Sequence, residues 1–575
     1  MQTLVRVLVV FAIALWYCAM TPVAARAGPA TALVGTWQLR ETVDELQSGS
    51  ITVVTADNPR AVFAGMSAAA RPDGSGLAFP FARDVGELRT PAVDADRITA
   101  FWIQPPGFNG TSYASPVVLD RIAPGIWRGT IAALQNPLVM SLYVQTNAAG
   151  TVHAFLREPN YNLGWTTYRI IGASLDGSTA RFTLAHGDPL VARFDRRHGS
   201  LTLHLPGAPV DAVTFERRPV TAPVIDRDTW TPLPTGDGWD IGNANDEGFS
   251  EQALMDLTRF AAGTTPQNVT DPDLQSLSIA RHGKLVYDAY FDGFSESTPH
   301  DTRSAGKTYA DVLAGVAIAA GAPLSEVTPI VPLFNYGELA NPDPRKASIT
   351  LGNALSMSTG LDCDDNDDAS AANEDTMQSQ EGEPDWYRYT LNTRMLHDPG
   401  TRAIYCSASI NLAGGAIARS TAAWLPAYFA QHVAEPLDMQ RYALNLTPTG
   451  QWYLGGGAYI RPRDFLKVGQ LFLDGGSWHG RRILDPSWIE RSWTPRAPLS
   501  PDDGYGYAWH IRTYTIGGTA YAAYEAQGNG GQILDAIPSL GLAVMMTAGN
   551  YQNYRTWGPT RDALVERIIA ALPRP

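Results

Sequence analysis

Ser304 and Lys307 are the two residues whose types and spacing most clearly suggest chemistry. They open a mostly apolar stretch that ends at Gly321 and lie three positions apart, so on a helix both side chains project from one face. In the first turn of such a helix, unpaired backbone N–H groups and the helix dipole favour negative charge on the serine oxygen. Burial would lower the pKa of the lysine and let a neutral amine accept a proton. The spacing therefore predicts a nucleophile with its base.

Three alternatives to that pair concern the same half of the chain. Ser-x-x-Lys also arises by chance where a helix cap precedes a surface lysine. Gly306-Lys307-Thr308 would end a phosphate-binding loop only if position 301 were glycine, and the chain has Asp301 there. His397-Asp398 would suggest a Ser-His-Asp triad, but no Gly-x-Ser-x-Gly sequence accompanies it, and a turn before Pro-Gly explains the two residues more simply.

Two further elements follow the serine segment in order. Tyr405-Cys406-Ser407 comes after a turn, and Gly528-Asn529-Gly530-Gly531-Gln532 stands just before an expected strand that begins at Ile533. With these three ordered motifs, the chain over about residues 235–575 resembles the serine hydrolases related to class C β-lactamases and penicillin-binding proteins. The connecting stretches 278–291, 355–361 and 455–464 share this resemblance.

The resemblance implies a role for each matching residue. Ser304 would be the acylated nucleophile, Lys307 would orient and deprotonate it, and Tyr405 would serve as both general base and general acid. The backbone N–H groups of Ser304 and Gln532 would form the oxyanion hole. Ser407 stands where β-lactamases of this group usually have asparagine, and its hydroxyl would hydrogen-bond the lysine or a substrate amide.

Asn529-Gly530-Gly531 occupies the place of the family's Lys-Thr-Gly motif. Lysine there helps to hold the substrate carboxylate, whereas Asn529 is uncharged, which argues against efficient hydrolysis of anionic β-lactams. The resemblance thus implies a serine hydrolase that cleaves a small-molecule ester, amide or peptide, without a cofactor. A D-amino-acid peptidase, a β-lactamase and a non-catalytic penicillin-recognising binding protein remain alternatives.

The elements that must position these residues fall into two regions. Residues 28–218 alternate short β-branched or aromatic runs with glycine turns, at 51–55, 97–102, 139–144 and 201–205, which predicts an all-β barrel. Its opening Gly35-Thr36-Trp37 resembles the Gly-x-Trp signature of lipocalin-type barrels. Residues 219–245 form a Pro-rich linker. Residues 246–575 alternate helices with strands, and strands at both ends predict one α+β domain whose sheet unites the two ends. The resemblance implies that this domain has the β-lactamase/transpeptidase fold, an antiparallel sheet flanked by helices.

Residues 1–27 are expected to be a signal peptide. Arg6 precedes an apolar run from Val7 to Met20, and Ala25-Arg26-Ala27 fits the small-x-small cleavage pattern. Cleavage would leave Gly28 first and send the protein to the periplasm or outside the cell. The rest of the chain has no run of the roughly 18 apolar residues that a membrane-spanning helix needs.

Two cysteines would remain after cleavage, Cys363 and Cys406, and in an oxidising compartment we expect them to form a disulfide rather than two separate thiols. That bond would bring the acidic loop 362–385 beside Tyr405, where it could rim the site. Trp386, Tyr387 and Tyr389 would then line an acyl pocket or simply pack. A Ca²⁺ loop starting at Asp362 would need glycine sixth and glutamate twelfth, and the chain has Asp367 and Asn373, so no metal site is expected.

Composition excludes several classes of protein. The chain has 575 residues, of which 45% are hydrophobic and 17% charged, so it is not disordered and is long enough for more than one domain. Its 43 Lys+Arg against 57 Asp+Glu give a net charge of −14. Without a basic run, the chain lacks the charge that binds nucleic-acid phosphates.

Overall fold

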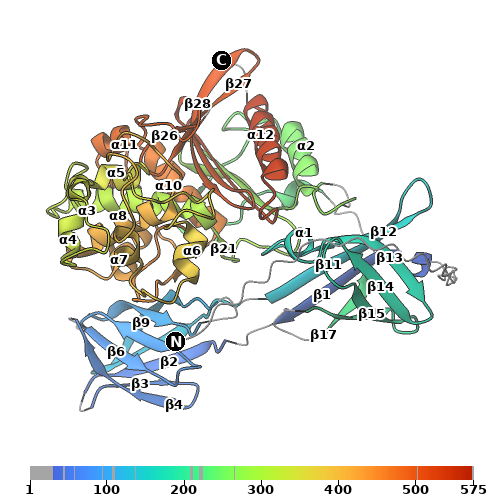
Figure 1. Ribbon diagram of the computed structural model, residues 1–575, viewed down its shortest axis with the longest axis horizontal. Helices are drawn as coiled ribbons and strands as arrows, with labels where there is room; N and C mark the ends of the chain where they lie inside the picture. Colours follow the sequence, from blue (N-terminus) through green and yellow to red (C-terminus); the bar gives the residue numbers. More distant parts are fainter. Residues whose placement is uncertain are drawn as a thin grey trace, which may run out of the picture.

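Two antiparallel β-barrels, each nearly closed, precede an α+β domain in the computed structural model (Figure 1). The structure describes residues 30–572 apart from short gaps at 43–45, 57, 75, 94, 107–109, 136, 207–211, 219–224, 264–265 and 502. The expected signal peptide therefore lies outside the described residues. No helix among the described residues is long and apolar enough to cross a membrane.

The first barrel is an eight-stranded antiparallel sheet in which β12 and β13, the two end strands, approach each other. Its strands, in spatial order, are β12 (Val152–Arg157), β11 (Pro137–Thr146), β1 (Gly35–Thr42), β17 (Ala212–Arg218), β16 (Ser200–His204), β15 (Leu190–Asp195), β14 (Thr179–Leu184) and β13 (Ile170–Asp176). Trp37 on β1 is fully buried in its core, where its indole N–H donates to the Leu33 carbonyl at 2.8 Å. The guanidinium of Arg217 lies 4.5 Å from the Trp37 ring.

The second barrel is inserted between β1 and β11 of the first. Its strands, in spatial order, are β4 (Met66–Ala69), β3 (Arg60–Phe63), β2 (Gly49–Val54), β10 (Ile126–Ile131), β9 (Tyr113–Ala123), β8 (Arg97–Ile103), β7 (Glu87–Thr90), β6 (Gly76–Pro80) and β5 (Arg71–Asp73). The β-rich, barrel-like prediction is confirmed, with two barrels in place of one. Both barrels have the same short strands and turns, so the sequence pattern does not reveal where one is inserted into the other.

The α+β domain is built on a mixed sheet that unites its two ends, as predicted, because β19 pairs with β30. The order is β18 (Asp240–Ile241), β20 (Lys284–Tyr290), β19 (Leu274–Arg281), β30 (Leu542–Ala548), β29 (Gln532–Ile537), β28 (Thr519–Gly528), β27 (His510–Ile516) and β26 (Gly504–Tyr505). Only the β18–β20 pair is parallel. His282 and Gly283, with φ of 49° and 82°, make the two-residue turn between β19 and β20.

Helices cover both faces of this sheet (Figure 1). The predicted helix after Ser250 is α2 (Glu251–Ala262), whose first turn is capped by the Ser250 hydroxyl, and it packs on one face together with α12 (Tyr554–Ala570). On the other face lies α10 (Pro462–Leu473), and a helical region packs beyond it in space. That region and its surroundings comprise α3 (Thr308–Ala319), α4 (Val331–Phe334), α5 (Leu351–Leu355), α6 (Glu374–Ser379), α7 (Trp386–Leu391), α8 (Ser407–Thr421), α9 (Leu425–Phe429) and α11 (Pro486–Ser492).

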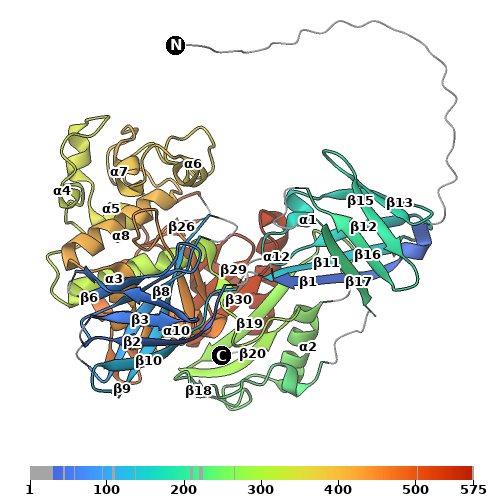
Figure 2. The ribbon, with the colours of Figure 1, turned by 90° about the horizontal axis from the view of Figure 1, so that it is seen from below.

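Both barrels are attached to the α+β domain. The second barrel lies under the helical region, in front of it when the molecule is seen from below (Figure 2). Its strand β9 pairs with β22 (Tyr442–Asn445), which pairs with β23 (Ala458–Ile460), which in turn pairs with β21 (His300–Asp301). A continuous ladder therefore runs from the second barrel to a point three residues before Ser304. A cavity of about 1290 Å³ opens where the two barrels and the α+β domain meet.

Residues 225–245, the described part of the expected linker, contribute to the α+β domain. Trp230 is buried and stacks on Tyr287 with ring centroids 5.7 Å apart. The short strand β18 adds an edge to the sheet beside β20. This segment is therefore packed against the domain that it precedes.

Candidate active site

Ser304 lies in a short 3-10 turn, Arg303–Lys307, that leads directly into α3. The turn places Ser304 and Lys307 on one side, and the Lys307 ammonium donates a hydrogen bond of 2.7 Å to Ser304 Oγ. Ser304 is partly exposed, whereas Lys307 is 2% exposed. A buried cation is thus held against an accessible hydroxyl.

Tyr405 reaches the same point from the start of α8. It stands two residues before Ser407, the first residue of that helix, and the Lys307 Nζ lies 5.0 Å from the centroid of its ring. The structure therefore brings Ser304, Lys307 and Tyr405 together. Beyond Tyr405 lies the ring of His510, 6.4 Å away between centroids, which is hydrogen-bonded to Asp503 at 2.8 Å.

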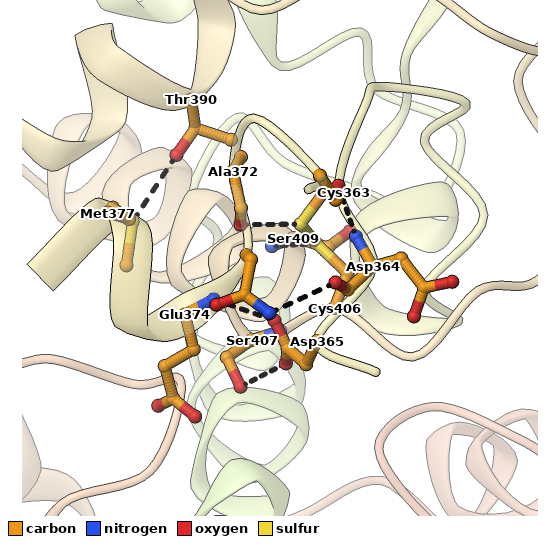
Figure 3. Close-up of a disulfide and its surroundings, with 12 residues drawn as sticks. Cys363, Asp364, Asp365, Ala372, Glu374, Met377, Thr390, Cys406, Ser407 and Ser409 are labelled. Carbon is orange, nitrogen blue, oxygen red and sulfur yellow. Dashed lines mark hydrogen bonds between the residues drawn. A yellow bond between two sulfur atoms is a disulfide. The ribbon is translucent and has the colours of Figure 1, made fainter. Parts of the chain in front are cut away.

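A disulfide beside Tyr405 links Cys363 to Cys406, with Cα atoms 5.6 Å apart, and confirms the predicted pairing (Figure 3). It brings the acidic loop to the start of α8. There the Asp365 carboxylate accepts hydrogen bonds of 2.7 Å from both the backbone N–H and the hydroxyl of Ser407. The Asp365 backbone N–H also donates to the Tyr405 carbonyl at 2.9 Å. Asp365 therefore bridges the backbone on both sides of Cys406.

The Ser407 hydroxyl donates to the Asp365 carboxylate, a contact that the sequence analysis did not predict. The sequence analysis did not identify Asp365 as a site residue. The predicted cysteine pairing was a signal for it, because the disulfide places Cys363, two positions before Asp365, next to Tyr405. The second Asp365 oxygen accepts from the Glu374 backbone N–H at 3.0 Å, and the Glu374 carboxylate accepts from the Tyr453 hydroxyl at 2.7 Å. Glu374 is thus a second acidic residue next to Asp365.

The charge of these acids changes the expectation for Lys307. Burial is the strongest single influence on the Lys307 pKa and lowers it, but the negative charges of Tyr405, Glu374 and Asp365 and a hydrogen bond with Tyr405 act against burial, and the pKa is raised. The sequence-based expectation of a lowered lysine pKa and a neutral amine was therefore wrong. Burial, and then the charge of Glu374, raise the pKa of Asp365 to about 6, while Lys307 acts to lower it.

The glycine turn 528–531 lies directly against the Ser304 turn. A Cβ on Gly528 would lie 2.3 Å from the Thr302 carbonyl oxygen, so only glycine allows this approach. Gly530 and Gly531 have φ of 96° and 105°, and a Cβ on Gly530 would lie 2.7 Å from the Tyr551 ring. The turn is thus shaped to fit between the nucleophile segment and Tyr551.

The two polar residues of this turn direct their side chains to the neighbouring strand and loop. The buried Gln532 amide donates to the Ala548 carbonyl at 2.6 Å and accepts from the Ala548 N–H at 3.2 Å. The Asn529 side-chain oxygen Oδ1 accepts from the Gln552 backbone N–H at 2.7 Å. Both side chains therefore fix the backbone of the turn. The Gln532 backbone N–H, as distinct from its side chain, is the group expected to donate to an oxyanion.

The alternative catalytic residues are engaged elsewhere. His397 contacts Arg402 at 3.5 Å, and Asp398 pairs with Arg345 at 3.1 Å, while Ser304 bonds Lys307. The aromatic residues that follow the acidic loop also pack instead of standing free. Trp386 lies against Tyr453, Tyr387 lies against Phe334, and the Tyr389 hydroxyl donates to the Ala371 carbonyl.

The acidic loop satisfies much of its charge through its own backbone. Asp362 accepts from the Ser370 hydroxyl and pairs with Arg394, and Asp367 accepts from the Ala369 N–H. Over the described ranges, no group of three or more His, Cys, Asp or Glu is arranged to hold a metal ion.

Comparison with known proteins agrees with this arrangement of motifs. Residues 270–565, more than half of the chain, match the beta-lactamase family. The 6-aminohexanoate-dimer hydrolase of Paenarthrobacter ureafaciens is 25% identical over 263 residues, which cover 43% of this chain and 64% of that protein. The chain thus spans somewhat less than two thirds of the length of that curated relative.

Solved structures of similar proteins include a penicillin-binding protein homologue from Caulobacter crescentus, with 16% identity and a TM-score of 0.44 over 56% of this chain and 97% of that one. Another is a D-stereospecific amidohydrolase from Streptomyces sp., with 14% identity and a TM-score of 0.40 over 52% of this chain and 96% of that one. The family resemblance of the three motifs is confirmed by the match over residues 270–565: the chain belongs to the beta-lactamase family of hydrolases.

Proposed function

We propose that this protein is an exported serine hydrolase that cleaves an ester or amide through an acyl-enzyme on Ser304. The observation that carries the proposal is the hydrogen bond of 2.7 Å from the buried Lys307 ammonium to the hydroxyl of the partly exposed Ser304, with the Tyr405 ring 5.0 Å from the same ammonium. A binding protein has no chemical need for all three groups in contact. Membership of the beta-lactamase family supports the same reaction class.

In the acylation step, Lys307 acts as a cation. Its raised pKa keeps it charged, so that it holds the Ser304 oxygen and stabilises negative charge on the Tyr405 oxygen. Tyr405, in its ionised form, takes the Ser304 proton as Oγ forms a bond with the carbonyl carbon and the carbonyl electron pair moves onto its oxygen. The backbone N–H groups of Ser304 and Gln532 would stabilise that oxyanion. The close contact of the glycine turn with the Ser304 turn supports this pairing of donors.

In the following step, the tetrahedral intermediate collapses, and the bond to the leaving alcohol or amine breaks. Tyr405 returns the proton to that leaving group, which gives the acyl-enzyme. Water then attacks the acyl carbon, loses a proton to Tyr405 and releases the acid, and Tyr405 gives the proton back to Ser304. Every proton in the cycle thus passes through one phenol beside one cation.

The substrate that we propose is a small uncharged or weakly charged ester or amide. Asn529 offers no positive charge, and its side-chain oxygen is already bonded to the Gln552 N–H, so the turn lacks the charge that would bind a substrate carboxylate. Asp365 and Glu374 add negative charge near Lys307. The name of the 25% identical relative, a 6-aminohexanoate-dimer hydrolase, favours an amide among these substrates.

Export is the part of the proposal supported by sequence. Arg6, the apolar run after it and Ala25-Arg26-Ala27 form the expected signal, and a disulfide is typical of oxidising compartments. Expression of the full chain in a bacterium, followed by fractionation and N-terminal sequencing, tests it. A mature protein that begins at Gly28 outside the cytoplasm is expected, and an uncleaved cytoplasmic protein would contradict export.

Turnover of short-chain phenyl esters tests the hydrolase. The Ser304→Ala variant should lose turnover, while Ser348→Ala, which removes an exposed hydroxyl bonded to the Arg345 carbonyl, should keep it. Equal rates for wild type and Ser304→Ala would support the binding-protein alternative. A chromogenic cephalosporin and a D-Ala-D-Ala peptide, assayed beside the esters, separate the β-lactamase and peptidase alternatives.

A further inference from the structure

A loop of the first barrel reaches the centre of the α+β domain. It comprises residues Glu158 to Asn162 and joins β12 to α1 (Leu163–Thr166), and we call it the barrel loop. It contacts two segments beside Ser304, namely the residue before the nucleophile and the turn after β30 that lies against the glycine turn. A structural barrel that stood apart from the reaction would have no such contacts.

The first contact is with Arg303, the residue directly before Ser304. Its guanidinium contacts two aromatic rings, with its carbon 4.8 Å from the centroid of Tyr551 and 5.9 Å from the centroid of Tyr161 in the barrel loop. The same guanidinium pairs with Asp301 at 2.9 Å. Tyr161 is also hydrogen-bonded to Tyr459, whose backbone pairs with Asp301. Tyr161 therefore contacts the nucleophile segment through its ring, while its hydroxyl bonds the neighbouring Tyr459.

The second contact is with Tyr551, which lies against Gly530 of the glycine turn. The Asn162 side-chain amide donates to the Tyr551 carbonyl at 3.0 Å, and Asn162 is 3% exposed. Asn550, next to Tyr551, forms a bridge to Gly530. The barrel loop thus holds the backbone that supports the turn in which the second oxyanion donor is proposed.

The barrel loop is itself fixed to the α+β domain. The Glu158 carboxylate is 1% exposed and accepts from the backbone N–H groups of Asn160 and Tyr161. The Pro159 carbonyl accepts from the Gln275 amide on β19 at 2.7 Å. Arg157, at the end of β12, donates to the carbonyls of Pro272 and Asp271. With these bonds, the loop is held rigidly enough to support its neighbours.

We propose that the barrel loop is part of the catalytic apparatus, with Tyr161 and Asn162 as positioning residues that hold the Ser304 turn and the glycine turn at their working separation. The proposal rests on the proposed function of Ser304. It gives the first barrel a role that residues 270–565 alone do not provide.

The backbone at Arg303 explains why support from outside the domain matters. Its φ of 48° is in the left-handed region, which is costly for a residue with a side chain and persists only where neighbours hold it. Its side chain is held by Asp301, Tyr551 and Tyr161. Loss of the Tyr161 ring would let the Ser304 turn relax, and a displacement of about 1 Å at a nucleophile can reduce a rate about 100-fold.

The experiment compares Tyr161→Ala with Tyr161→Phe in the full-length protein. Reactive sites are counted by titration with a serine-directed phosphonate, and kcat and KM are measured per titrated site on a short phenyl ester. Tyr168→Ala is the matched control, because Tyr168 belongs to the same barrel but packs in that barrel's own core, where its hydroxyl donates to the Pro206 carbonyl. If Tyr161→Ala does not fold, Tyr161→Leu replaces it. Melting temperatures are recorded for every variant.

We expect Tyr161→Ala to lose about tenfold in kcat per titrated site with little change in KM, since the loss is one of transition-state geometry. Tyr161→Phe, which keeps the ring over Arg303, should restore kcat. Tyr168→Ala should lower the melting temperature while its titrated sites keep the wild-type kcat.

Two results would overturn the proposal: a wild-type kcat in Tyr161→Ala, or an equal loss of kcat in Tyr161→Ala and Tyr168→Ala, which would mean only that a damaged barrel destabilises the protein. Failure of the wild type to react with the phosphonate would instead refute the proposed function. The two failures are therefore distinguishable.

Discussion

The two sides of the Ser304 centre are held by different means. On the disulfide side, which comprises Cys363, Asp365, Tyr405, Cys406 and Ser407, a covalent bond and a carboxylate fix the start of α8. On the barrel side, which comprises Glu158, Tyr161, Asn162, Arg303 and Tyr551, non-covalent contacts act: the ion pair of Arg303 with Asp301, the aromatic rings around Arg303, and hydrogen bonds from a separate barrel. The disulfide side holds the proton carrier, and the barrel side holds the nucleophile turn and the proposed oxyanion donors.

Each side also contains a carboxylate whose pKa is raised, first of all by burial. On the disulfide side, burial and Glu374 raise the pKa of Asp365 to about 6. On the barrel side, burial raises the pKa of Glu158 to about 8, against the effect of the two backbone N–H groups that bond it. Asp365 acts on Lys307 and hence on the chemistry, whereas Glu158 acts on the conformation of the barrel loop. Changes on the disulfide side should therefore affect pH dependence of turnover, and changes at Glu158 should affect stability.

The largest effect is expected at Tyr405, the proton carrier of the disulfide side. Tyr405→Phe should lower kcat at least about 100-fold, the lower end of what general acid–base catalysis contributes. Steady-state kinetics on a phenyl ester measure it. Tyr389→Phe, which removes a hydroxyl bonded to the Ala371 carbonyl of the acidic loop, should keep a kcat close to that of the wild type. A Tyr405→Phe variant with wild-type kcat would remove Tyr405 from the mechanism.

Cleavage of the Cys363–Cys406 disulfide should be the next largest effect. The cysteines are 43 positions apart, and for a loop of this size the chain-entropy argument gives a loss of about 4 kcal/mol in stability. Turnover should fall as well, because the bond brings Asp365 to Tyr405 and Ser407. Melting temperature and kcat are measured for wild type and for Cys363→Ser/Cys406→Ser, each with and without dithiothreitol. Reductant should affect the wild type alone, and a wild type indifferent to reduction would contradict this account.

A smaller effect is expected in the pH profile of Asp365→Asn. Removal of this charge lets burial lower the Lys307 pKa, so the limb of the kcat/KM profile in which Lys307 loses its proton should move to lower pH. Asp368→Asn removes an exposed charge from the same loop and serves as the control. A limb that moves equally in both variants would show a general effect of loop charge instead of a specific effect of Asp365.

The smallest effect is expected on the barrel side, in the pH dependence of stability. The folded Glu158 has a pKa of about 8, against an ordinary glutamate value of 4.5, so the folded state binds its proton more tightly than the unfolded state does. Its contribution to stability is therefore present at low pH and is lost as pH rises toward and through about 8. Glu158→Gln should reduce the fall in melting temperature between about pH 4.5 and pH 8, the interval between the unfolded and the folded pKa. An unchanged or steeper fall would contradict the assignment.

The disulfide side was largely predictable from the sequence, and the barrel side was not. The presence of two cysteines in a chain with an expected export signal predicted a disulfide between them. That disulfide in turn predicted that the acidic loop lies near Tyr405. The predicted direction of the Lys307 pKa shift was wrong, because that pKa depends on the charges of Asp365 and Glu374. The fold alone sets how close those two residues lie to Lys307. Nothing in the local pattern around Tyr161 or Asn162 indicated contact with Arg303 or Tyr551, because residues hundreds of positions apart meet only through the docking of whole domains. The insertion of one barrel into the other was hidden because both barrels have the same short strands and turns.

The central claim is that Ser304 is the nucleophile of this hydrolase, and covalent labelling tests it most directly. Wild-type protein would be treated with a serine-directed phosphonate, and the modified residue would be located by mass spectrometry of proteolytic peptides. The account predicts one phosphonate per chain, attached to Ser304, and no attachment in the Ser304→Ala variant. Attachment at another residue, or undiminished labelling of Ser304→Ala, would contradict it.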